Sequence, residues 1–124
     1  MANPLASLLI VEDDISSQQY YSIILNNIYE LCIVPTVADA KVALSENEFS
    51  LAIIDLSLPG DEDGTALMKH IRVALKSDLP ILAISAHAFP QNRDSALEAG
   101  ASEFFTKPIL STSLMNAVER FLKI

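Results

Sequence analysis

Short continuous apolar runs alternate along the chain with segments whose apolar residues recur at helical spacing. Continuous runs of this length are typical of parallel strands whose two faces are both buried. Strands are therefore predicted over 7–11, 31–34, 51–56, 81–85 and 103–106. Helices are predicted over 15–29 and 38–46, from about 65 to 75, from 90 to 99, and from 111 or 112 to near residue 122.

The first predicted helix has the clearest periodic pattern. Tyr20, Ile24 and Ile28 recur at a spacing of four, with Tyr21 and Leu25 beside them. Residues four apart lie on the same face of a helix, so these side chains are expected to form one buried stripe.

Helix boundaries are marked by residues with known capping preferences. Asp14 precedes the first helix and can accept hydrogen bonds from its free N–H groups. Pro90 suits the first turn of the fourth helix, where a missing N–H costs little. Gly100 follows that helix where a left-handed cap is common.

This regular alternation predicts an α/β fold. Five strands and five helices imply a doubly wound parallel sheet with right-handed crossovers and helices on both faces. We expect the flavodoxin-like strand order 2-1-3-4-5. The 124 residues are long enough for one such domain, spanning 1–124, and too short for a second.

Polar side chains suited to phosphate or metal chemistry follow three of the apolar runs. Glu12 and Asp13 follow the first run, while Asp55 and Ser85 end the third and fourth predicted strands. Because the carboxyl ends of parallel strands lie at one edge of a sheet, we expect these residues to share a site.

Carboxylates gathered at one edge repel each other, so at least one of their pKa values should be raised. A divalent cation would relieve the repulsion, and Mg²⁺ prefers oxygen ligands, with Mn²⁺ as another possible occupant. Asp13 and Asp55 are the candidate direct ligands. Glu12 could bind through water, and the backbone carbonyl of Ser57 could complete the protein's contribution.

A metal beside Asp55 would leave its carboxylate able to attack phosphorus in line. Lys107 could then pair with the carboxylate or with a phosphate, and the Ser85 hydroxyl could bond a phosphoryl oxygen. These residues therefore favour phosphoryl transfer to an aspartate.

Composition limits the other possibilities. The net charge of −8 argues against nonspecific nucleic-acid binding by this chain. No apolar stretch is long enough to enter and cross a bilayer. The single cysteine, Cys32, and the lack of a secretory-signal pattern over residues 1–5 predict a cytoplasmic location.

The chain resembles the receiver domain of response regulators across nearly its full length. The resemblance is carried by Val11-Glu12-Asp13-Asp14, Asp55-Leu56-Ser57-Leu58-Pro59, Ser85-Ala86 and Lys107-Pro108. It implies a phosphoacceptor at Asp55, served by a histidine kinase or a histidine phosphotransfer protein. It also implies magnesium held by Glu12, Asp13 and Asp55, and a cis peptide bond between Lys107 and Pro108. Such a domain is not a multiple-turnover enzyme.

The resemblance further implies a switch formed by Ser85 and Phe104. The output surface would be the fourth helix, fifth strand and last helix. Two departures from the family pattern stand out. The loop 59–64 looks one residue longer than usual, with three acidic residues, and Ser57 occupies a position that can tune phosphate lifetime.

Alternative functions remain at this point. One is an aspartate-nucleophile phosphatase, although that class has a second aspartate at the position that Ser57 occupies here. Another is a receiver-like binding module that is never phosphorylated. The segment 85–93 with Lys107-Pro108-Ile109 favours receivers of hybrid kinases and phosphorelays. The chain is either a stand-alone receiver or part of a longer protein.

Overall fold

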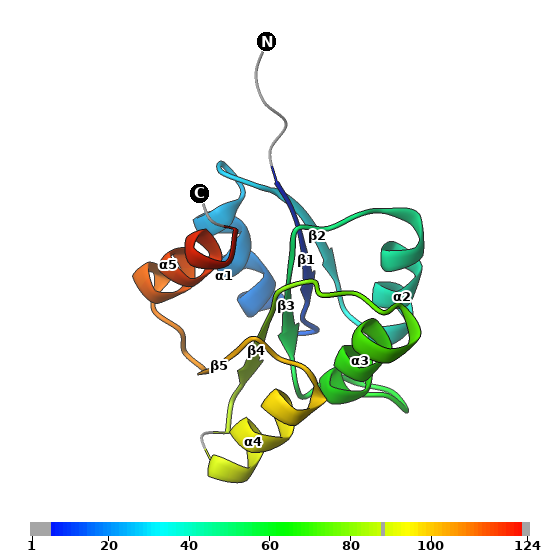
Figure 1. Ribbon diagram of the computed structural model, residues 1–124. Helices are drawn as coiled ribbons and strands as arrows, with labels where there is room; N and C mark the ends of the chain where they lie inside the picture. Colours follow the sequence, from blue (N-terminus) through cyan, green and yellow to red (C-terminus); the bar gives the residue numbers. More distant parts are fainter. Residues whose placement is uncertain (1–5, 88, 123–124) are drawn as a thin grey trace.

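The computed structural model describes residues 6–87 and 89–122, so residues 1–5, which carry the prediction of no secretory signal, lie outside the described part. Figure 1 shows helices on both sides of a central sheet. The strands are β1 (Ser7–Val11), β2 (Glu30–Val34), β3 (Leu51–Asp55), β4 (Ile81–Ser85) and β5 (Glu103–Thr106). The helices are α1 (Ile15–Leu25), α2 (Val37–Glu46), α3 (Gly64–Lys69), η1 (His70–Ala74), α4 (Pro90–Ala99) and α5 (Ser111–Leu122).

The sheet is parallel throughout, with the order β2-β1-β3-β4-β5. This confirms the predicted fold and strand order. At the carboxyl ends, Val11 lies opposite Ile54 and Asp55 lies opposite Ile84. The register therefore brings the residues that follow β1 beside the end of β3.

A separate hydrophobic core fills the space on each face of the sheet. Residues of α2, α3 and α4 pack with one set of strand side chains, which includes Leu9 and Ile54. Residues of α1 and α5 pack with the other set, which includes Ile10 and Ile53. Since successive side chains of a strand point to opposite faces, continuous apolar runs supply both cores.

The predicted extent and buried stripe of the first helix are partly wrong. The helix ends at Leu25, and the chain turns before β2, so Ile28 lies outside it with 39% of its surface exposed. Tyr20 is also 38% exposed. The buried residues of α1 are Tyr21 and Leu25, which both belong to the predicted stripe.

The third predicted helix changes its hydrogen-bonding pattern before it ends. The α-helical turns of α3 pass at His70 into a π-helical turn that ends at Ala74. Leu67, Met68 and Ile71 are buried. Leu75, the last residue of the predicted helix, lies just beyond the observed one and is 44% exposed.

The capping predictions are confirmed. The Asp14 carboxylate accepts a hydrogen bond from the Ser17 N–H at 2.9 Å. Pro90 occupies the first turn of α4, and Gly100 ends that helix with a φ of 120°. No helix within 6–87 and 89–122 has the length and apolar character needed to cross a membrane.

Candidate functional site

Three carboxylates converge at the carboxyl edge of the sheet. Carboxylate oxygens of Glu12, Asp13 and Asp55 lie within 4.8 Å of one another. Glu12 and Asp55 are 1% and 5% exposed, whereas Asp13 is exposed. The site thus consists of two buried acids with a third that faces solvent.

The turn after β1 fixes the Glu12 side chain. The backbone N–H of Glu12 donates to the Val34 carbonyl at 3.0 Å, which extends the pairing with β2. Its Oε2 accepts from the Asp14 N–H at 3.1 Å, and the Gln18 amide donates to its carbonyl at 2.6 Å. Neither the spacing of Gln18 nor its residue type had indicated this contact.

Lys107 lies between the two buried acids. Its Nζ donates to Asp55 Oδ2 at 3.0 Å and lies 2.7 Å from Glu12 Oε1. The second contact is an ion pair only, because Glu12 Oε1 accepts no hydrogen bond from the described residues. The peptide bond to Pro108 is cis, as expected from the resemblance. Lys107 therefore contacts the Asp55 carboxylate, as predicted, and it also contacts Glu12.

Burial and charge shift the titration of this cluster. Burial raises the pKa of Glu12, the nearby Asp55 carboxylate adds to the rise, and Lys107 opposes it. The predicted direction is confirmed, although burial outweighs repulsion as its cause. Burial alone would lower the pKa of Lys107, but its contacts with the Glu12 and Asp55 carboxylates raise it.

Ser57 and Ser85 lie near Asp55, at or just after the carboxyl ends of the neighbouring strands β3 and β4. The Ser57 N–H donates to Asp55 Oδ1 at 2.9 Å, so both Asp55 oxygens have a donor. Ser85 is buried, and its hydroxyl oxygen accepts from the His87 N–H at 3.0 Å. Because that bond uses only a lone pair, the Ser85 hydroxyl proton stays available to another acceptor.

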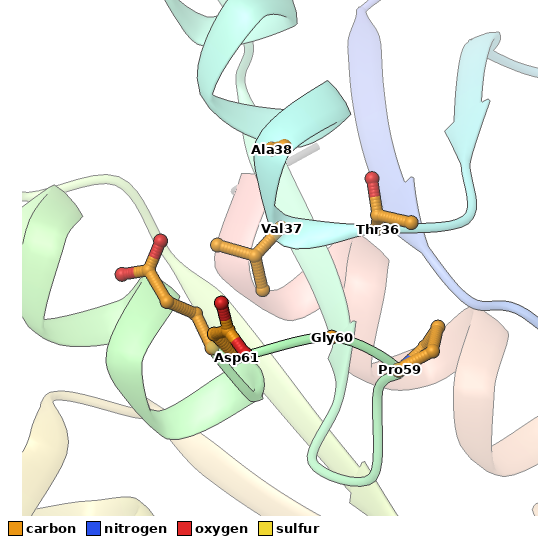
Figure 2. Close-up of a pocket in the computed structure, with 7 residues that line it drawn as sticks. Thr36, Val37, Ala38, Pro59, Gly60 and Asp61 are labelled. Carbon is orange, nitrogen blue, oxygen red and sulfur yellow. The ribbon is translucent and has the colours of Figure 1, made fainter.

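The longer acidic loop lies to one side of this cluster. A hollow of about 460 Å³ lies between this loop and the start of α2. Figure 2 shows Pro59, Gly60 and Asp61 on the loop side, facing α2. Lys41 of α2 binds Glu62 at 2.9 Å, and Asp63 caps α3 through the Ala66 N–H. Two of the three loop acids thus have structural contacts, and none belongs to the carboxylate cluster.

The buried Tyr21 gives an expected dependence of stability on pH. Burial raises the pKa of Tyr21 well above its usual value, and Glu12 and Asp55 add to the rise. The unfolded chain loses this proton above about pH 10 while the folded chain keeps it, so stability falls as pH rises beyond that point. Urea unfolding at pH 8 and pH 11 should show a smaller fall for Tyr21→Phe. An equal fall in both proteins would contradict this assignment.

Comparison with known sequences decides the family. Residues 8–119 match the profile of the response regulator receiver domain. The chain belongs to this family. It is 33% identical over 119 residues to the transcriptional regulatory protein GltR of Pseudomonas aeruginosa, covering 94% of this chain and 49% of that protein. It is 32% identical to the swarming motility regulation protein RssB of Serratia marcescens, and the match covers 91% of this chain and 51% of RssB.

Solved structures of receiver domains agree with this assignment. A CheY-like receiver domain protein from Methanospirillum hungatei is 28% identical, with a TM-score of 0.88. The match covers 96% of this chain and 94% of that protein. The receiver domain of a signal transduction histidine kinase from Syntrophus aciditrophicus is 29% identical, with a TM-score of 0.85. The match covers 95% of this chain and 90% of that domain. The chain spans about half the length of GltR and RssB.

Family membership supplies the coarse function. Receiver domains act in two-component signal transduction as phosphoacceptors and typically are not enzymes. Membership of this family implies that the partner is a histidine kinase. The acidic cluster of Glu12, Asp13 and Asp55 is consistent with the metal site of a receiver.

Proposed function

We propose that Asp55 accepts a phosphoryl group from a phosphohistidine. The observation that carries the proposal is the buried Asp55 carboxylate, held by Ser57 and Lys107 inside a cluster of acids. In the transfer, an Asp55 oxygen forms a bond to phosphorus as the phosphorus–nitrogen bond breaks. The electron pair returns to the imidazole nitrogen, and the product is an acyl phosphate.

The acidic cluster has the donor chemistry for a hard divalent cation. Glu12, Asp13 and Asp55 offer closely spaced carboxylate oxygens, and the Ser57 carbonyl is a further candidate ligand. These residues would hold Mg²⁺, and Mn²⁺ would also suit them. A bound ion would neutralise charge on the phosphoryl oxygens.

Lys107 and Ser85 would bind the phosphoryl group. The Lys107 ammonium already contacts Asp55 and can exchange that carboxylate for a phosphoryl oxygen, a charge-assisted hydrogen bond of similar kind. The Ser85 hydroxyl, whose proton is unused in the contact with His87, can donate to another phosphoryl oxygen. Both residues would therefore stabilise the acyl phosphate.

Phosphorylation would be read on the face formed by α4, β5 and α5. Phe104 is half-buried and packs against the core below α4, so movement of Ser85 toward the phosphate can be coupled to its ring. A groove of about 560 Å³ runs along this face. Its lining residues are Pro90, Arg93, Phe104, Phe105, Thr106, Pro108, Ile109, Leu110 and Ser113.

The donor would be a histidine kinase or a histidine phosphotransfer protein in the cytoplasm, and residues 1–124 would act as one receiver domain. The similarity to the receiver of the Syntrophus aciditrophicus kinase supports a hybrid-kinase or phosphorelay setting. The similarity to GltR equally supports a place in a transcriptional regulator. The chain would not turn over external substrates.

The proposal is tested by incubating the protein with a small acyl phosphate and Mg²⁺. We expect a labile phosphoryl adduct, detected by intact mass, that fails to form when EDTA removes the metal. Steady hydrolysis of a phosphate monoester would instead support the phosphatase. An unmodified protein that binds no Mg²⁺ would support a receiver-like binding module.

A further inference from the structure

The segment that carries Lys107 is held at its start and near its end. It joins β5, which ends at Thr106, to α5, which begins at Ser111. The Lys107 N–H donates to the Ser85 carbonyl at 2.8 Å. Two residues later, the Tyr20 hydroxyl donates to the Ile109 carbonyl at 2.7 Å. The second bond joins α1 to a segment 89 residues further along the chain.

Helix α1 is also tied to the acidic side of the site. Its cap, Asp14, accepts from Ser17, and Gln18 donates to the Glu12 carbonyl. Tyr20 lies two residues after Gln18 on the same helix. Helix α1 therefore contacts the turn that presents Glu12 and the segment that presents Lys107, so it can fix their separation.

We propose that Tyr20 is a positioning residue that holds the Lys107 ammonium between Glu12 and Asp55. The inference rests on the proposed function, in which Lys107 binds the phosphoryl group. The hydroxyl acts through the backbone of Ile109 and does not touch the reacting atoms. Displacing a positioned group by about an ångström can slow a reaction substantially, so one well-placed hydrogen bond is sufficient for this role.

Packing of the Tyr20 ring is a separate effect that must be removed from the test. The ring is partly exposed and borders a shallow groove of about 470 Å³ that also includes Lys107, Pro108, Ile109 and Leu110. Tyr20→Phe keeps the ring and removes only the hydroxyl. Tyr29→Phe is the matched control, because Tyr29 is a buried tyrosine in the turn before β2, at the opposite end of the sheet.

The deciding experiment is a double-mutant cycle on the rate of phosphorylation by a small acyl phosphate at saturating Mg²⁺. Tyr20→Phe should slow the reaction about threefold to tenfold, the range expected for the loss of one hydrogen bond. Its Mg²⁺ affinity and that of Tyr29→Phe should match wild type. In a Lys107→Met background, Tyr20→Phe should have no further effect. An equal slowing in that background, or none in wild type, would overturn the proposal.

Amide hydrogen exchange separates this proposal from the proposed function. If wild type is not phosphorylated, the proposed function fails, but the anchoring can still be measured. Tyr20→Phe should speed exchange of the Lys107 N–H, which is bonded to Ser85, and leave the N–H groups of β1 unchanged. Unchanged exchange at Lys107 would overturn the anchoring role.

Discussion

Lys107→Met is expected to slow phosphorylation of this receiver by about 100-fold or more, because removing one preorganised donor from a reaction site has a cost of that order. Its Nζ contacts Asp55 and Glu12, and its side chain is 23% exposed. Methionine retains most of the chain length but has no charge, so packing changes little. The rate with a small acyl phosphate at saturating Mg²⁺ is the measurement.

The same variant should also lose stability. Without Lys107 the buried Glu12 and Asp55 carboxylates have no cation beside them, which costs about 3 kcal/mol for a pair of this burial. Urea unfolding without divalent ions should show this loss, and Mg²⁺ should restore part of it. Lys69→Met, which changes a lysine of α3 away from the cluster, is the control. Equal phosphorylation rates in Lys107→Met and wild type would contradict the role of Lys107.

Gly64→Ala is expected to damage both the fold and the acceptor. A Cβ at this position would overlap the backbone carbonyl oxygen of Asp55 and press on Leu56. Backbone atoms cannot move aside as a flexible side chain can, so we expect destabilisation of about 1–3 kcal/mol. The displaced Asp55 should also react more slowly, by about tenfold or more for a shift near one ångström.

Gly60→Ala separates loss of stability from damage to the site. Gly60 has a φ of 99°, which disfavours alanine, but a Cβ there would meet no atom within 4 Å. The variant should lose about 1–2 kcal/mol of stability through backbone strain and keep its phosphorylation rate. If Gly64→Ala phosphorylates as fast as Gly60→Ala, the close approach of Gly64 does not position Asp55.

The sequence was sufficient to predict the fold because its strands are continuous apolar runs. Such runs have one suitable environment, a parallel sheet covered on both faces, and their order follows from the topology of that class. The buried face of α1 was harder to predict. Tyr20-Ile24 and Tyr21-Leu25 have the same spacing, and it is the packing of α1 against the core that buries the second pair and leaves Tyr20 exposed.

The residue types of the site were predictable, but several of its contacts were not. Glu12, Asp55 and Ser85 each lie at or just after a strand end, which placed them at one edge. The contacts of Gln18 with Glu12 and of Tyr20 with Ile109 depend on how α1 packs beside two loops. No local pattern can mark the second contact, because it joins residues 89 positions apart.

Phosphorylation of Asp55 can be measured by phosphotransfer from a phosphohistidine donor to wild type, Asp55→Asn and the control Asp94→Asn. Asp94 is an exposed acid on α4, and it is not part of the carboxylate cluster formed by the described residues. We expect label to move to wild type and Asp94→Asn, and none to be retained by Asp55→Asn. Label retained by Asp55→Asn would contradict phosphorylation of Asp55.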